Sequence, residues 1–353
     1  MADRRPTIHD VAQAAGVSAM SVSRVLNSRP GVSPETARRI EQAVRTLGYR
    51  PNMLAANFRQ QRGVSLIGMI VPDPYTPLFT SVAVAVGELV RDHGLIVVTA
   101  SSGGDVAQER ALVTSFFERG IDGILLFSED HDHRYLEPEL DRGRPLVFLG
   151  SPPVGVMGPT VLVDNRGGAA EAVAHLLRHG HRRIGIVTKP ASFPASERLA
   201  GYREAVARHG IDTDPSLVHV VANVAEPGRR AVEALLARPD PPTAIFSTNY
   251  LLTAGMLGPF RAYPPVALVA FDDFEAALLV DPPISVVTQD PPAMAAHATR
   301  MLLAQLDGIG DRAAVAVVPP RLIPRGTGEL PPAKGVRYRY RRFGATVKRS
   351  ASR

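Results

Sequence analysis

Two short amphipathic segments within residues 7–26, separated by one glycine, restrict what the start of this chain can form. Thr7 and Asp10 have the spacing of a reciprocal helix cap, in which each side chain accepts the backbone amide of the other. Apolar residues then recur on one helical face, at Ile8, Val11, Ala12 and Ala15. Gly16 permits a sharp turn, and Ser18 can cap a second helix. The pattern predicts a helix-turn-helix.

The second helix is expected to bury one face and expose the other. Its buried face carries Val22, Val25 and Leu26, and its outer face carries Ala19, Met20, Ser23 and Arg24. Helix-turn-helix proteins place such an outer face in the major groove of DNA. A third helix should begin at Pro34 behind a Ser33 cap and end at Gly48, with a buried face formed by Ala37, Ile40, Val44 and Leu47. Three such helices are typical of a DNA-binding headpiece.

Charge is divided unevenly along the chain. Residues 1–62 carry a net charge of +6, residues 331–353 carry +8, and residues 63–330 carry −8. A basic head on an acidic body predicts that the head alone meets a polyanion. The tail over 331–353 alternates Tyr338 and Tyr340 with arginines, and we expect it to be disordered. It either adds salt-sensitive affinity for DNA or only keeps the chain in solution.

Composition excludes several classes of protein. The chain is 45% hydrophobic and 21% charged, as is ordinary for a globular protein, and it has no run of eighteen apolar residues that would span a membrane. Its first residues lack the apolar core of a secretory signal, and it contains no cysteine for disulfides or thiolate chemistry. We expect a cytoplasmic protein without membrane contact.

From residue 65 the pattern changes to alternating helices and apolar strands. Helices are predicted to stop at Gly94, Gly120 and Gly180, each shortly before a strand rich in β-branched residues. The expected strands are 66–71, 95–100, 124–127, 145–149, 184–188, 217–221, 243–246, 266–270 and 284–287. With roughly ten strands, we predict an α/β fold of two doubly wound parallel subdomains rather than one large sheet.

No arrangement of residues indicates catalysis or a cofactor. The chain has no Gly-x-Ser-x-Gly elbow and no phosphate-binding Gly-Lys-Ser/Thr loop, and Asp272 with Asp273 lacks a neighbouring nucleophile. His131 and His133 flank an aspartate in a polar stretch, which we interpret as a solvated loop rather than a metal site. We therefore expect no enzyme, no metal and no cofactor.

The sequence resembles that of the lactose/galactose repressor (LacI/GalR) family. The shared headpiece residues are Thr-Ile-x-Asp-Val-Ala from Thr7, Ala-Gly-Val-Ser from Ala15, Val-Ser-Arg-Val-Leu-Asn from Val22, Val-Ser-Pro-Glu-Thr from Val32 and Leu-Gly-Tyr-x-Pro-Asn from Leu47. Matches continue through the body, among them Val163-Asp164-Asn165, Glu197 to Tyr202 and Phe271-Asp272-Asp273. The resemblance covers about residues 6–328.

The resemblance implies a helix-turn-helix headpiece over 1–51, a hinge helix and linker over 52–62, an effector-binding domain over 63–330 and the basic tail. The effector domain would be shaped like a periplasmic sugar-binding protein, with one lobe from about 63–162 and 289–318 and the other from about 163–288 and 319–330. The chain would cross between lobes more than once. The family also implies a ligand-controlled repressor that binds a near-palindromic double-stranded DNA operator as a homodimer.

The family pattern also implies which headpiece and hinge residues contact DNA. Ala19, Met20 and Arg24 would read bases, with Arg24 donating two hydrogen bonds to a guanine. The remaining contacts, mostly to phosphates, are expected from Thr7, Ser18, Ser21, Asn27, Ser33, Thr36, Tyr49 and Asn52, although capping or solvation explains each of these nearly as well. Phe58 stands where the family usually has a leucine wedge in the minor groove. It either inserts there or packs between two hinge helices.

The effector site is implied by four positions, Arg198, Asn249, Asp272 and Gln289, with Asp73 and Phe79 as weaker candidates. Their side chains offer the hydrogen bonds that a sugar-like ligand needs. The plainer alternatives are a loop cap for Asp272 and a surface salt bridge for Arg198. Gly150 and Tyr250 replace acidic residues of the family pattern, which leaves the ligand open. The alternative function is a small-molecule carrier of the periplasmic-binding type, which calls for a signal peptide and no headpiece.

Overall fold

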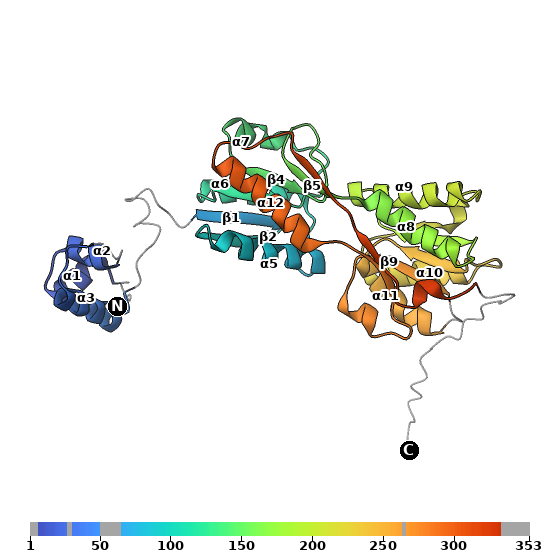
Figure 1. Ribbon diagram of the computed structural model, residues 1–353, viewed down its shortest axis with the longest axis horizontal. Helices are drawn as coiled ribbons and strands as arrows, with labels where there is room; N and C mark the ends of the chain where they lie inside the picture. The colour runs from blue at the N-terminus through green and yellow to red at the C-terminus, as the bar shows by residue number, and fades with distance from the viewer. Residues whose placement is uncertain (1–5, 27–29, 50–64, 263–265, 333–353) are drawn as a thin grey trace, which may run out of the picture. The chain divides into compact units, whose positions relative to one another are not determined.

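The computed structural model describes residues 6–26, 30–49, 65–262 and 266–332 of the chain. The chain divides into two compact units, Met1–Ser65 and Leu66–Arg353 (Figure 1). The predicted hinge, the candidate DNA contacts Asn27, Asn52 and Phe58, and the tail from residue 333 onward lie outside the described residues. Within the described ranges, no helix is long and apolar enough to cross a membrane.

The headpiece consists of three helices, α1 (Ile8–Ala15), α2 (Ala19–Leu26) and α3 (Pro34–Leu47). The predicted reciprocal cap is confirmed, because the Thr7 amide donates to Asp10 Oδ2 (2.7 Å) and the Asp10 amide donates to Thr7 Oγ1 (3.3 Å). Gly16 ends α1 with φ of 62°, a left-handed conformation that suits glycine. The helices close on a core of Val11, Ala12, Ala15, Val22, Ile40 and Ala43.

The second unit contains two six-stranded sheets. The first has the order β11-β5-β4-β3-β1-β2, from β1 (Ser65–Val71), β2 (Leu95–Ser101), β3 (Gly123–Leu126), β4 (Leu146–Leu149), β5 (Thr160–Val163) and β11 (Val315–Val318). The pairs β1–β3, β3–β4, β4–β5 and β5–β11 are parallel. In register, Gly68 of β1 lies opposite Ile124 of β3, and Leu125 lies opposite Val147 of β4.

The second sheet has the order β12-β10-β9-β8-β6-β7. Its strands are β6 (Ile184–Thr188), β7 (Val218–Val220), β8 (Ala244–Ser247), β9 (Ala267–Phe271), β10 (Ser285–Thr288) and β12 (Arg321–Ile323). All of its pairs are parallel except β10–β12, which is antiparallel. We call the first sheet with its helices the first lobe and the second sheet with its helices the second lobe.

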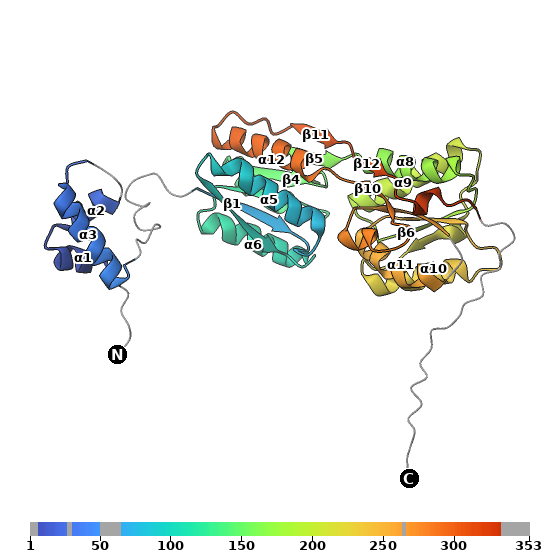
Figure 2. The same ribbon diagram turned by 60° about the horizontal axis from the view of Figure 1, so that its bottom comes forward.

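Helices cover both faces of each sheet (Figures 1 and 2). In the first lobe, α5 (Pro77–Arg91) and α12 (Pro291–Leu306) pack on one face, and α6 (Val106–Glu118) and α7 (Glu137–Asp141) pack on the other. In the second lobe the pairs are α8 (Asn165–Arg178) with α9 (Phe193–Arg208), and α10 (Ala225–Leu236) with α11 (Tyr250–Ala262). Alternate strand residues enter alternate cores: Leu125 faces α5 and α12, whereas Ile124 faces α6.

The predicted α/β class with two parallel subdomains is confirmed. The sequence interpretation missed β5, β11 and β12. Neither β5 nor β12 follows a helix that ends in glycine, and β11 begins only several residues beyond Gly308, where the chain leaves α12. Between β5 and α8, between β10 and α12, and between β11 and β12, the chain passes from one lobe to the other. The precise bounds of the domains remain a prediction.

Candidate functional site

The outer face of α2 holds two of the three predicted base readers. Met20 is 66% exposed and Arg24 is also exposed, so both side chains are free to meet a partner surface. Ala19 does not point outward as expected. It is half-buried against the headpiece core, since it begins α2 directly after the turn and its methyl group contacts the apolar cluster. The exposed part of this face therefore consists mainly of one long apolar side chain and one cation.

Hydroxyl groups of the predicted phosphate contacts form helix caps. Ser18 Oγ accepts the Ser21 amide (3.1 Å), and Ser33 Oγ accepts the Thr36 amide (3.3 Å) at the start of α3. Thr7 caps α1, and Tyr49 packs at the rim of the core. The capping alternative is therefore realised for Thr7, Ser18 and Ser33, and any contact of these residues with phosphate stays a prediction.

The six candidate effector residues line one pocket between the lobes. Asp73 and Phe79 come from the segment after β1 and from α5, whereas Arg198 comes from the first turns of α9. Asp272 and Gln289 directly follow β9 and β10, and Asn249 lies two residues after β8. Parallel strands deliver the residues that follow them to one edge of a sheet, where doubly wound folds bind ligands. The sheet topology thus brings together positions that are far apart in the sequence.

Asp272 is the centre of the polar side of this pocket. Its Oδ1 accepts Gln289 Nε2 (2.7 Å), and its Oδ2 accepts Asn249 Nδ2 and Arg198 Nη1, both at 3.4 Å. Asp272 has φ of 73°, the left-handed region that non-glycine residues seldom adopt. Such strain is found where surrounding interactions hold a residue in place for function. The loop-cap alternative for Asp272 is wrong, because its carboxylate binds three other side chains.

Arg198 is buried rather than on the surface, so the surface salt-bridge alternative is also wrong. Its Nε donates to Asn165 Oδ1 (2.8 Å), its Nη1 donates to the Thr248 carbonyl (2.6 Å), and its guanidinium lies 3.6 Å from the ring centre of Phe271. Burial lowers the pKa of Arg198, and the nearby Asp272 carboxylate opposes this shift. The side chain is fixed in a single orientation toward the pocket.

The first lobe contributes an apolar side to the same pocket. The rings of Phe79 and Phe127 lie 4.6 Å apart between centres, and Leu149 is beside them. Gly150 has φ of 79°, and a Cβ there would lie 3.3 Å from the Phe127 ring. An acidic side chain at this position would therefore be strained and would crowd Phe127. The Asp73 carboxylate is held locally by the Tyr75 amide (2.9 Å) and the Thr76 hydroxyl (3.1 Å).

Several pocket residues were missed in the sequence interpretation. Phe127, Asn165, Lys189 and Asn223 all lie within a few residues of the carboxyl end of a strand, so strand ends were the available signal. Asn165 follows β5, which was not predicted. Within the described part of the chain, Asn223 Oδ1 is buried and accepts no hydrogen bond. A ligand hydroxyl would satisfy such an acceptor.

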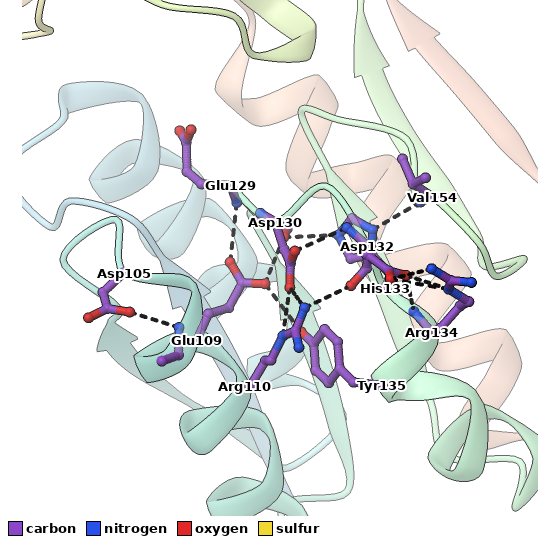
Figure 3. A network of polar contacts seen from close by, with 12 residues as sticks. Asp105, Glu109, Arg110, Glu129, Asp130, Asp132, His133, Arg134, Tyr135 and Val154 are labelled. Carbon is purple, nitrogen blue, oxygen red and sulfur yellow. Dashed lines mark hydrogen bonds and ion pairs between the residues drawn. The ribbon is translucent and has the colours of Figure 1, made fainter.

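The interpretation of the stretch with His131 and His133 as a solvated loop is wrong. His131 is exposed, but His133 is buried and hydrogen-bonds with Ser128 Oγ and with the Val154 amide, both at 2.9 Å (Figure 3). The expectation failed because the partners of His133, Ser128 and Val154, come from residues on both sides of the stretch. Burial lowers the pKa of His133. In the described ranges, no cluster of three metal-ligating side chains occurs.

Comparison with known proteins supports this view of both units. A family model described as bacterial regulatory proteins, lacI family, matches residues 7–52, and one described as periplasmic binding protein-like domain matches residues 173–327. The HTH-type transcriptional repressor CytR of Escherichia coli (strain K12) is 30% identical over 308 residues, which cover 86% of this chain and 90% of the relative.

Two solved structures resemble the chain along most of its length. The transcriptional regulator CelR-cellobiose complex is 30% identical, covers 92% of this chain and 100% of its own, and has a TM-score of 0.67. The Lac repressor dimer bound to operator and the anti-inducer ONPF is 22% identical, covers 92% and 99% of the two chains, and has a TM-score of 0.77. At that identity the second likeness shows a shared fold.

Proposed function

Because the chain belongs to the lacI family of bacterial regulatory proteins, we propose that it is a repressor that binds a near-palindromic operator as a homodimer under the control of a small effector. Its relatives are transcriptional regulators, so its activity is DNA binding rather than catalysis. The effector is a sugar or a related metabolite held between the lobes. The observation that carries this proposal is the convergence of Arg198, Asn249, Asp272 and Gln289 on one pocket.

The chemistry of the pocket supports a sugar-like effector. The group around Asp272 offers both donors and acceptors in fixed positions, and the Phe79–Phe127 pair offers an apolar surface. Sugars present hydroxyls at their edges and C–H groups on their faces, so they satisfy both sides. The cellobiose in the complex of the CelR relative is a ligand of this kind.

The operator is read by the exposed face of α2. Arg24 is the donor that distinguishes guanine, and Met20 supplies apolar contact to a base edge. Substituting Arg24 by alanine should weaken operator binding by about 1–3 kcal/mol and relax the preference at one base pair of each half-site. Competition gel shifts with operators altered at single positions measure both effects. Arg38→Ala is the matched control, since Arg38 is an exposed arginine of α3 that donates to the Pro34 carbonyl.

A second copy of the chain covers an apolar face of the first lobe. Along the edge strand β2 and its neighbour α5, the side chains of Val84, Leu89, Ile96 and Val98 are exposed. Monomers seldom leave an edge strand of this kind unprotected. Ile96→Lys should shift the protein from dimer to monomer in sedimentation velocity, whereas Ile309→Lys, at a still more exposed isoleucine that follows α12, should not.

The experiment that tests the whole proposal is footprinting on promoter DNA near the gene of this protein, with a panel of sugars and nucleobases added in turn. We expect a footprint with two-fold symmetry that one compound weakens or strengthens at a defined concentration. If no nearby promoter shows a symmetric footprint, the repressor function is overturned. If a symmetric footprint responds to no compound, only the control by an effector is overturned, and the repressor function stands.

A further inference from the structure

The segment after β3 is organised by a buried carboxylate. Glu109 of α6 is buried, and its Oε1 accepts the hydroxyls of Ser128 (2.6 Å) and Tyr135 (3.2 Å), while its Oε2 accepts the backbone amide of Glu129 (3.2 Å) (Figure 3). Burial raises the pKa of Glu109, and these hydrogen bonds oppose the shift. A buried carboxylate is tolerated only when donors surround it, so the three donors are held where they are.

His133 fixes the same segment from its other side. Its Nδ1 accepts the Val154 amide (2.9 Å), which places the ring proton on Nε2, and Nε2 donates to Ser128 Oγ (2.9 Å). Ser128 in turn donates to Glu109 and accepts the Asp130 amide (2.9 Å). Each hydrogen bond in this network therefore has only one possible donor and one possible acceptor. The backbone of residues 128–130 is therefore locked in one conformation.

This lock determines where the side chain of Glu129 goes. The carboxylate of Glu129 points away from the network (Figure 3), and its Oε1 accepts Lys189 Nζ at 3.3 Å. Glu129 follows β3 of the first lobe, and Lys189 directly follows β6 of the second lobe. Both residues line the pocket. Among the ion pairs formed by described residues, the others join groups of a single lobe or lie within one helix.

We propose that the Glu129–Lys189 pair is a clasp that holds the two lobes together when no effector is bound, and that Glu109 positions it through the amide of Glu129. The inference rests on the proposed function, in which the effector binds between the lobes. Lys189 is 19% and Glu129 is 35% exposed, so the pair is partly screened by water. Its loss should lower the ratio of closed to open molecules about two- to fivefold.

A clasp of this size sets the threshold of the response. An effector that binds only closed molecules has an apparent affinity reduced by the fraction that is open. A two- to fivefold lower closed-to-open ratio weakens the binding of the effector by up to the same factor through this equilibrium alone. The residues of the clasp thus tune the effector concentration at which the operator responds.

The test measures lobe separation without any effector. The chain has no cysteine, so spin labels at Ala111→Cys in α6 and Ala207→Cys in α9, both exposed alanines on helices of different lobes, report one distance. In double electron–electron resonance, Lys189→Met and Glu129→Gln should each add a population of molecules with a longer distance between the labels. In the double variant this population should be no larger than in either single variant. Arg142→Met, which removes an ion pair within the first lobe, is the matched control and should leave the distribution unchanged.

The positioning role of Glu109 has its own readout. Glu109→Gln keeps the shape but replaces one of the two carboxylate oxygens with a donor, so the Glu129 amide and the Ser128 and Tyr135 hydroxyls compete for one remaining acceptor. It should shift the distances as Lys189→Met does. Combined with Lys189→Met it should cause no further shift, while a merely structural role would add its effect. Ser128→Ala provides a second route if Glu109→Gln unfolds. Adding 500 mM KCl should shift the parent distribution and leave that of Lys189→Met unchanged.

Unchanged distances in Lys189→Met overturn the clasp, and additive shifts in the double variant overturn the positioning by Glu109. Neither result depends on DNA. A protein with an intact clasp that gives no symmetric footprint would overturn the repressor function and leave the clasp standing.

Discussion

The two sides of the effector pocket are built from opposite kinds of groups. The second lobe contributes a buried arginine and an aspartate that hydrogen-bond with each other and with two amide side chains. The first lobe contributes the aromatic pair Phe79–Phe127 and the nearby Leu149. The charged groups that line the pocket from the first lobe, Asp73 and Glu129, already have partners.

This difference separates two contributions to binding. Hydrogen bonds to fixed, partly buried charged groups give direction, and they discriminate strongly against a ligand that leaves one unpaired. Aromatic surface gives affinity with less discrimination between ligands of similar shape. We therefore expect substitutions in the second lobe to abolish recognition, and substitutions in the first lobe to weaken it by degrees.

The largest effect should come from Arg198→Met. It removes the hydrogen bonds to Asn165 and to the Thr248 carbonyl, and it leaves the Asp272 carboxylate without its cation. Breaking a buried charge pair in this way costs about 3–5 kcal/mol of unfolding free energy. Urea unfolding measures the loss, and the response of operator binding to the effector should disappear. Arg166→Met, which removes a largely exposed pair with Glu204, should barely move the unfolding midpoint.

A smaller effect is expected for Asp272→Asn. Asparagine tolerates the left-handed backbone at φ of 73°, so the loop should keep its shape while the charge is lost. Losing charge-assisted hydrogen bonds should weaken the effector by roughly 10- to 100-fold, or about 1.5–3 kcal/mol. Titration calorimetry with the compound found by footprinting checks this value. Equal affinity in the two proteins would show that Asp272 only supports Arg198.

Phe127→Leu should weaken the effector about two- to tenfold, because one ring of the aromatic pair is lost and an apolar side chain remains. Selectivity among related sugars should change little, in contrast to Asp272→Asn. Phe117→Leu is the control, since Phe117 is buried against the opposite face of the same sheet and does not line the pocket. A change of preferred sugar in Phe127→Leu would contradict the division of roles between the two sides.

The smallest effect should appear in the pH dependence of stability. Burial holds the folded-state pKa of His133 below its ordinary value of 6.5, so the unfolded chain binds a proton more readily than the folded protein. Stability contributed by neutral His133 is present above pH 6.5 and is lost as the pH falls below it, by at most about 1.4 kcal/mol per pH unit. The melting temperature of His133→Asn should therefore fall less between pH 7 and 5.5 than that of the exposed-site control His131→Asn.

Much of the fold follows from signals that lie within a few residues of one another. Thr7 with Asp10 predicted the start of α1, Gly16 predicted its end, and Ser33 with Pro34 predicted the start of α3. Such caps depend on contacts between neighbours in the chain, which a sequence displays directly. The helix–glycine–strand units were visible for the same reason. Strands such as β5, which have no such punctuation, were not.

The candidate site could be predicted only as far as family positions reach. The four positions around Asp272 were named from the sequence, and the tertiary structure brought them to one pocket across as many as 91 residues, from Arg198 to Gln289. Arg198 and His133 are buried because distant parts of the chain supply their hydrogen-bond partners, the Thr248 carbonyl and the Val154 amide. Burial of a polar side chain depends on what surrounds it, and no local pattern contains that information.

The sequence by itself therefore determined the headpiece, the α/β class and the family, because short-range caps, periodicity and motifs encode them. Only the tertiary structure decided which side chains share the pocket, that its two sides differ in chemistry, and that Glu129 of one lobe meets Lys189 of the other. Parallel sheets gather strand ends that are remote in sequence, and hydrogen bonds among the gathered groups then fix each side chain.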